Sequence, residues 1–209
     1  MKYFGIDTTR KKAKVFKIDL ENAENNIFVD IDENIKHSEG MFLYVEKLLM
    51  EAGETLKDYD GYVTIVGPGS FTGIRVGMST IKAFSKALNK PVIPINTFEI
   101  LRNVSKNAII ILQCTKTSWY YADIVGGKIG NVGVLNTENI LEYVGSKKLI
   151  VLRDEHSKLN IEYNNIVIVD NIDDLYIETL KEKLNSGETF DVVPYYIQLS
   201  QAERNLKNE

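Results

Sequence analysis

The order of strands and helices narrows the fold most, because the same order occurs in both halves of the chain. Each half opens with three short apolar strands and continues with alternating helices and strands. In the first half we expect strands at Tyr3–Asp7, Lys14–Asp19, Asn26–Ile31, Gly61–Val66 and Pro91–Ile95, and helices over Met41–Ala52, about Thr72–Leu88 and from Thr97. In the second half we expect strands at Ala108–Gln113, Trp119–Val125, Val132–Leu135, Leu149–Leu152 and Ile166–Asp170, and helices over Thr137–Val144 and Asp173–Leu184. This order favours mixed sheets covered by helices.

The repeat predicts two domains, residues 1–102 and 103–209. The chain has 209 residues, of which 44% are hydrophobic, and is long enough to bury two cores. The order of elements in each half resembles a ribonuclease H-like domain of the actin-like ATPase superfamily, and the second half is the looser copy. The predicted fold class is therefore α/β, with two ribonuclease H-like domains whose mixed sheets are covered by helices.

Composition removes several classes of protein. No run approaches the ~20 apolar residues of a membrane span, and "MKYFGIDTT" has a strand pattern without the apolar core of a signal peptide, so we expect a cytoplasmic protein that does not contact membranes. One cysteine, Cys114, and two isolated histidines, His37 and His156, offer neither a disulfide nor a spaced set of metal ligands. No metal or other cofactor is expected. The net charge of −4 argues against nucleic-acid binding by this chain alone.

A glycine-rich segment, "GPGSFTG" at residues 67–73, lies between an expected strand and the longest expected helix. It is not a phosphate loop of the form G-x-x-x-x-G-K-S/T, since isoleucine and arginine follow Gly73, and it does not fit the dinucleotide fingerprint G-x-G-x-x-G. Two interpretations stay open. In one, amides at the start of the helix, with a Ser70 or Thr72 cap and Arg75 one turn on, attract an anion. In the other, the glycines only allow a tight strand-to-helix turn.

The helix after this segment is rich in small residues, with Gly73, Gly77, Ala83 and Ala87 along it. Each glycine costs about 1 kcal/mol relative to alanine in a helix, so a compensating contact is expected. Small side chains let another helix or backbone approach closely. The helix is therefore either buried against its own domain or a docking face for a second protein, and helical periodicity does not separate the two.

These segments together resemble the TsaB (YeaZ) family. The matching stretches are "FGIDTT", "HSEGMFLYVEKLLMEAG" and "GPGSFTGIRVGMSTIKAFSKAL", of which the last carries the specific pattern G-P-G-S-F-T-G-I/V-R-I/V-G. The resemblance covers about residues 1–102 and is loose beyond them, with an echo of the family's tail in "PYYIQLSQAER" from Pro194. It implies two actin-like ATPase domains in a non-catalytic subunit.

The resemblance also implies partners. The subunit would form a heterodimer with TsaD, which transfers threonylcarbamoyl to the adenosine beside the anticodon of tRNA, and TsaE, an ATPase, would join the larger assembly. The chain would meet tRNA indirectly, through the complex, and would form a homodimer when alone. No residue is expected to be catalytic. The expected partner-binding residues are Met41, Val45, Leu48, Gly73, Val76, Gly77, Thr80 and Ala83, and an anion or nucleotide contact would fall on Asp7, Gly69, Ser70, Thr72 and Arg75.

The loop after the first strand keeps a rival function open, that of an actin-like small-molecule kinase or ATPase. Such kinases have D-x-G-x-T/Q there, in which the acid holds magnesium through water and the glycine lets the backbone approach phosphate. Here Asp7 is present, but Thr9 stands at the glycine position. The counterpart in the second half, "LQCTKTSWYY", has neither acid nor glycine. Stand-alone ATP hydrolysis is therefore not expected.

The second half also departs from the TsaB pattern. Where the family tends to have Asp-Ala-Arg and a following acid, this chain has Gln113, Cys114, Thr115 and then Ser118, and Gln198 stands at the arginine position of the tail. These changes remove the charges through which the family's second domain would make contacts.

Overall fold

The structure is a computed structural model that describes residues 1–32 and 37–198 of the chain. The chain forms two compact units: Met1–Asn96 with Ile177–Pro194, hereafter unit 1, and Thr97–Tyr176 with the described residues from Tyr195 onward, hereafter unit 2. The chain leaves unit 1 a few residues before the expected boundary after residue 102, and it returns to unit 1 near its end. Most of the tail segment that echoes the family pattern lies outside the described residues.

Unit 1 contains one five-stranded mixed sheet in the order β3-β2-β1-β4-β5. Its strands are β1 (Lys2–Asp7), β2 (Lys14–Asp19), β3 (Ile27–Asp30), β4 (Gly61–Gly67) and β5 (Val92–Asn96). The first three strands form an antiparallel meander, and β4 and β5 run parallel to β1. The parallel strands require helical crossovers, which α1 and α2 provide.

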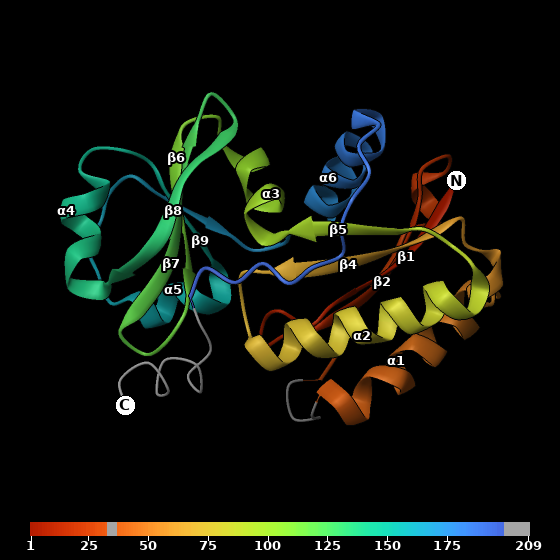
Figure 1. Cartoon of the computed structure of the whole chain (residues 1–209). Coiled ribbons are helices and arrows are strands. Elements are labelled where there is room, and N and C mark those ends of the chain that lie inside the picture. The colour runs from red at the N-terminus through yellow and green to blue at the C-terminus, as the bar shows by residue number, and fades with distance from the viewer. Residues whose placement is uncertain (33–36, 199–209) are drawn as a thin grey trace, which may run out of the picture. The chain divides into compact units, whose positions relative to one another are not determined.

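The long helices of unit 1 cover both faces of this sheet. Figure 1 shows α1 (His37–Ala52) and α2 (Phe71–Leu88) on one face, and α6 (Asp173–Ser186), most of which belongs to unit 1, on the other. Short 3-10 turns, η1 (Ala23–Asn25) and η2 (Leu56–Asp58), complete the unit. None of the described helices combines the length and the apolar composition that crossing a membrane requires.

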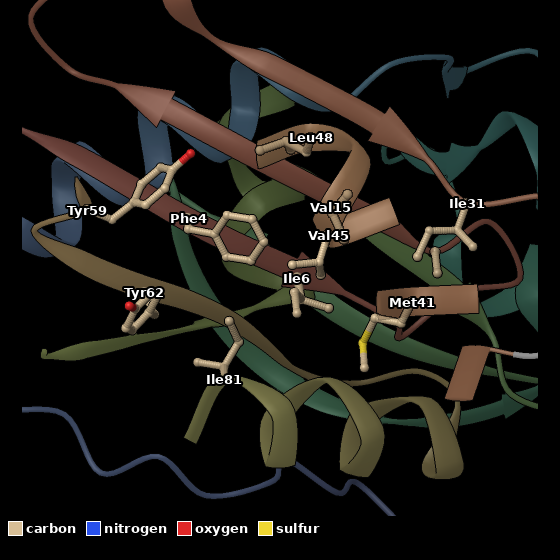
Figure 2. Close-up of a cluster of buried hydrophobic side chains, with 11 residues drawn as sticks. Phe4, Ile6, Val15, Ile31, Met41, Val45, Leu48, Tyr59, Tyr62 and Ile81 are labelled. Atoms are coloured by element: carbon tan, nitrogen blue, oxygen red, sulfur yellow. The ribbon is translucent and has the colours of Figure 1, made fainter. Parts of the chain in front are cut away.

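The core of unit 1 lies between the sheet and helices α1 and α2. Strand residues two apart point to the same face, and α1 presents apolar residues three and four apart to meet them. Figure 2 shows the resulting cluster: Phe4, Ile6, Val15, Ile31, Met41, Val45, Leu48, Tyr59, Tyr62 and Ile81. Each of these side chains is at most 5% exposed, so each contributes about 1.5–3 kcal/mol by burial.

Unit 2 contains a second five-stranded sheet in the order β10-β9-β6-β7-β8. Its strands are β6 (Ala108–Gln113), β7 (Ser118–Val125), β8 (Lys128–Asn136), β9 (Leu149–Leu152) and β10 (Ile166–Val169). Its helices are α3 (Thr97–Leu101), α4 (Ile140–Val144) and α5 (Arg153–Leu159), with 3-10 turns η3 (Arg102–Val104) and η4 (Thr137–Asn139). The fully buried Trp119 lies at the centre of its core and donates a hydrogen bond from its indole nitrogen to the Thr137 hydroxyl at 3.0 Å.

The two sheets have the same topology. If strands are numbered within each unit, both orders read 3-2-1-4-5 with an antiparallel meander and two parallel strands. This is the sheet of a ribonuclease H-like domain, and the predicted fold class is confirmed. Several bounds differ from the prediction: α1 begins at His37 and not at Met41, and the helix expected over Thr137–Val144 begins as the 3-10 turn η4. Strand β8 begins earlier than expected, directly after the Gly126-Gly127 turn, and α5 was not expected, because Arg153–Leu159 carries too few apolar residues to show helical periodicity.

Candidate functional site

The GPGSFTG segment joins β4 to α2 and packs against the turn that follows β1. The Ser70 hydroxyl accepts a hydrogen bond from the amide of Gly73 at 3.1 Å and so caps α2. The Ser70 amide in turn donates to the carbonyl of Thr9 at 2.6 Å. The Thr8 hydroxyl donates to the carbonyl of Gly73 at 2.6 Å. These bonds fasten the start of α2 to the β1 turn.

The glycines of this segment and helix are needed for that close approach. A Cβ atom at Gly69 would overlap the carbonyl of Thr9, and one at Gly73 would overlap the carbonyl of Thr8. A Cβ atom at Gly77 would overlap the Thr8 hydroxyl. The contact that offsets the helical cost of these glycines is therefore made within unit 1, with the turn after β1.

Asp7, the acid that a kinase would use to position magnesium, is 1% exposed in this structure. One carboxylate oxygen accepts hydrogen bonds from the Thr9 amide at 2.8 Å and the Thr9 hydroxyl at 2.6 Å. The other oxygen lies 3.7 Å from the Arg10 guanidinium. The carboxylate thus stabilises its own turn, with Thr9 occupying the position where a kinase has glycine.

The other residues expected to meet an anion do not converge on one point. Ser70 and Thr72 are exposed, and Gly69 is half-buried against Thr9. The Arg75 side chain is exposed, and its guanidinium lies over the ring of Phe71, 4.2 Å from the ring centre. The anion contact predicted for these residues stays a prediction.

Most of the expected partner-binding residues are buried inside unit 1. Met41, Val45 and Leu48 are 1%, 5% and 0% exposed and point into the core shown in Figure 2. The structure also buries Gly73, Gly77 and Thr80. These six residues are buried in their own unit, and their contact with a partner stays a prediction, because helical periodicity marks the face that is buried without showing what buries it. Only Val76, half-buried, and Ala83, exposed, are within reach of a second protein.

The opposite sides of the same two helices are exposed and carry unusual residues. On α1, Phe42, Leu43 and Met50 are 56%, 59% and 79% exposed. On α2, which contacts α1, the exposed positions include small residues at helical spacing, Ser79 and Ala83, next to the half-buried Val76. We call these six residues the α1/α2 face. Large apolar side chains that are more than half exposed often mark an interaction site, so these residues are the candidate binding surface.

Sequence reasoning missed Phe42, Leu43 and Met50. A signal for them exists: apolar residues on α1 occupy more of the helix circumference than one core-facing stripe needs. Phe42 and Leu43 directly follow Met41, and consecutive residues are about 100° apart around a helix, so the three cannot share one face. The excess marks a second apolar side.

In unit 2, the two departures from the family pattern lie next to each other. The Cys114 sulfur is 3.8 Å from the side-chain oxygen of Gln198. The side-chain oxygen of the neighbouring Gln113 accepts a hydrogen bond from Lys158 at 3.0 Å, and the backbone amide of Gln113 donates to the buried Glu155 carboxylate at 2.9 Å. Among the residues described, no three His, Cys, Asp or Glu side chains are grouped so as to hold a metal ion.

Comparison with known proteins finds one matching family model and relatives named for the same tRNA modification. A family model described as tRNA N6-adenosine threonylcarbamoyltransferase (TsaD) matches residues 33–148. The tRNA threonylcarbamoyladenosine biosynthesis protein TsaB of Buchnera aphidicola is 29% identical over 150 residues, which cover 65% of this chain and 66% of that protein. The tRNA N6-adenosine threonylcarbamoyltransferase of Clostridium kluyveri is 44% identical over 83 residues, 40% of this chain and 24% of the enzyme. The chain thus spans just under two thirds of the former and about a quarter of the latter.

Solved structures extend the likeness over almost the whole chain. YeaZ from Pseudomonas aeruginosa matches with a TM-score of 0.70 at 18% identity, covering 93% of this chain and 99% of that one. A crystal structure described as an uncharacterized protein with similarity to peptidase YeaZ from Pseudomonas aeruginosa matches with a TM-score of 0.72 at 16% identity, covering 94% and 99%. At these identities the likeness shows a shared fold of both units.

Proposed function

The chain belongs to the TsaB/YeaZ family of tRNA threonylcarbamoyladenosine biosynthesis proteins, and from this premise we propose that it is a non-catalytic subunit that binds TsaD and supports threonylcarbamoyl transfer to the adenosine next to the anticodon of tRNA. The substrate and the transfer chemistry belong to TsaD in this proposal. The role of this chain is to hold TsaD in an active assembly.

The observation that carries the proposal is the α1/α2 face. Three large apolar side chains, each more than half exposed, lie on a helix whose other side already fills the core of unit 1. Leaving them in water forgoes the roughly 1.5–3 kcal/mol that burial of each would contribute. A partner protein would recover that free energy, and the small residues on α2 would let a partner helix approach closely.

The α1/α2 face also suggests which assemblies the chain forms. We propose a heterodimer with TsaD, to which TsaE is added through other surfaces, and a homodimer through the α1/α2 face when TsaD is absent. The chain carries a net charge of −4, so tRNA would be gripped by the complex and not by this subunit alone.

Reconstitution tests the proposal. Mixed with TsaD, TsaE and the enzyme that makes the threonylcarbamoyl donor, the chain should form a stable complex with TsaD and restore modification of a tRNA that lacks it. Omitting the chain should abolish both the complex and the modification. Modification at the full rate without the chain, or no complex in size-exclusion chromatography at micromolar concentrations, would refute the proposal.

A nucleotide assay tests the rival function. The isolated protein is expected to hydrolyse ATP with magnesium no faster than a buffer blank, because the Asp7 carboxylate is engaged by Thr9 and lies beside Arg10. The measurement is phosphate release, with the Asp7→Asn variant as its control. Turnover by the wild type that disappears in Asp7→Asn, in a variant with an unchanged melting temperature, would favour an ATPase or kinase.

A further inference from the structure

Unit 2 holds a buried carboxylate that no part of the proposed function uses. Asp123 lies on β7, where the pairing with β8 is interrupted between Ala122 and Ile124. The extra residue of this bulge lies on β8, where Gly130 and Asn131 together lie opposite the single residue Asp123. Asp123 is 8% exposed and has no cationic partner among residues 1–32 and 37–198, which is unusual for a charged residue.

The hydrogen bonds to Asp123 satisfy only one of its two oxygens. Oδ2 accepts from the Tyr143 hydroxyl at 3.1 Å and from the side-chain amide of Asn131 at 3.4 Å, a long contact. Oδ1 is buried and has no hydrogen-bond partner among the described residues. Both donors to Oδ2 are neutral. Burying a carboxylate that has one unsatisfied oxygen and only neutral donors costs free energy, and a cationic ligand would offset that cost.

Two glycines on β8, Gly130 and Gly133, place no side chain of their own beside this buried carboxylate and its neighbour Tyr121. Gly130 is exposed, and a Cβ atom placed there would lie 3.6 Å from the Asp123 carbonyl and 3.7 Å from its Cβ, with nothing nearer. Above Asp123 there is thus room that any other residue would fill. Gly133 leaves space for the ring of Tyr121, which folds across the strand. Asn131 is exposed and is held by the 3.4 Å contact alone, so it is easily displaced.

An aromatic pair stands beside the carboxylate. The rings of Tyr121 and Tyr143 lie 4.6 Å apart between centres and are tilted by 55°. Burial, the neighbouring Tyr121 hydroxyl and the Asp123 charge raise the pKa of Tyr143 far above its usual value. Tyr143 is therefore a neutral donor at every physiological pH, and neither ring repels a cation. Tyrosine faces attract cations by about 0.5–2 kcal/mol.

We propose that Asp123, Tyr121 and Tyr143 form a binding site for a primary ammonium group, which enters over Gly130, displaces the Asn131 amide from Oδ2 and pairs with the Asp123 carboxylate. The site is independent of TsaD binding. A metal ion does not suit it, because one carboxylate and two phenols are too few strong oxygen ligands for calcium or magnesium. A guanidinium suits it less well than an ammonium, since the planar fork of arginine seeks both carboxylate oxygens and Oδ2 is already engaged.

Titration with simple amines tests the site. With the full-length protein labelled with nitrogen-15, butylammonium chloride at up to about 10 mM, a range suited to weak ligands, should shift the backbone amide signals of Gly130 and Asn131 in a saturable way. Sodium chloride at the same ionic strength should not. Absence of a saturable shift in the wild type would overturn the proposal.

Two variants localise the binding. Asp123→Asn should weaken it at least about tenfold, because the charge that pairs with the ammonium is gone. Gly130→Leu should abolish it by covering Asp123 while leaving the melting temperature nearly unchanged, since a Cβ there meets only ordinary contacts. The control Glu142→Gln removes a charge from an exposed position next to Tyr143 and should bind like the wild type. Unchanged binding by folded Gly130→Leu would show that the site lies elsewhere, even if Asp123→Asn fails to fold.

Two further ligands distinguish between two possible sources of the ammonium group. Spermidine represents a free polyamine, and Nα-acetyl-lysinamide represents a lysine side chain of another protein. Tighter binding of spermidine than of butylammonium would assign the site to polyamines, and tighter binding of the lysine derivative would assign it to a protein partner. N-acetyl-argininamide should bind more weakly than either. If it binds more tightly, the choice of ammonium over guanidinium is wrong.

Discussion

Replacing Leu43 by aspartate should leave the protein folded and weaken its binding to TsaD by a factor of roughly 30 to 1000, equivalent to about 2–4 kcal/mol. Leu43 is 59% exposed on the α1/α2 face and takes no part in the core of unit 1. A charge at this point would have to be desolvated in the complex without a partner. Isothermal titration against TsaD gives the affinity, and thermal melting of the free variant gives the stability, which should change by no more than about 0.5 kcal/mol.

A matched substitution in the other unit separates this effect from a general effect of added charge. Val125 on β7 is 67% exposed, and Val125→Asp should bind TsaD like the wild type. The Leu43→Asp variant also tests the proposed homodimer, since this variant should be monomeric when TsaD is absent. Equal binding by Leu43→Asp and the wild type would show that TsaD docks elsewhere on the protein.

The α1/α2 face shows which features of α1 could be predicted from the sequence and which could not. The spacing of Met41, Val45 and Leu48 correctly predicted a helix with one apolar side, and the order of elements correctly predicted both sheets. The assignment of that apolar side to a partner stays a prediction, since these side chains pack into the core of unit 1. An apolar stripe satisfies the same periodicity whether the core or another protein covers it. The run Met41-Phe42-Leu43 indicates a second apolar side on α1, and the packing of α1 on its own sheet shows that Phe42 and Leu43 are the ones left exposed.

The glycines of α2 illustrate a different limit. Their helical cost correctly indicated that something approaches closely, but the residue that approaches, Thr8, is more than 60 positions away in the sequence and meets the helix only when β1 and β4 pair. The position of Asp123 depends in the same way on the register between β7 and β8. A bulge is a property of two paired strands and leaves no mark on either one alone.

The contact between α2 and Thr8 can be dissected by adding single methyl groups. Gly73→Ala should lower the free energy of unfolding by about 1–3 kcal/mol, although alanine is the better helix former by about 1 kcal/mol, because the new Cβ overlaps the backbone carbonyl of Thr8. For a chain of this size, that loss lowers the melting temperature by roughly 2–4 °C per kcal/mol. Gly77→Ala should also destabilise the protein, since its Cβ overlaps the Thr8 hydroxyl.

A second substitution, Thr8→Ala, should relieve the destabilisation in one of the two variants and not in the other. By itself, Thr8→Ala removes the hydrogen bond to the carbonyl of Gly73 and should cost about 1 kcal/mol. In that background the obstacle to a methyl group at position 77 is gone, so Gly77→Ala should become neutral or stabilising by up to about 1 kcal/mol. Gly73→Ala should remain destabilising, because the carbonyl it meets belongs to the backbone and is kept by alanine. Urea titration of the wild type, the three single variants and the two double variants measures both coupling energies. A coupling for the pair at positions 8 and 77 that is no larger than for the pair at 8 and 73 would contradict this account, and would mean that α2 shifts as a whole to accommodate either methyl group.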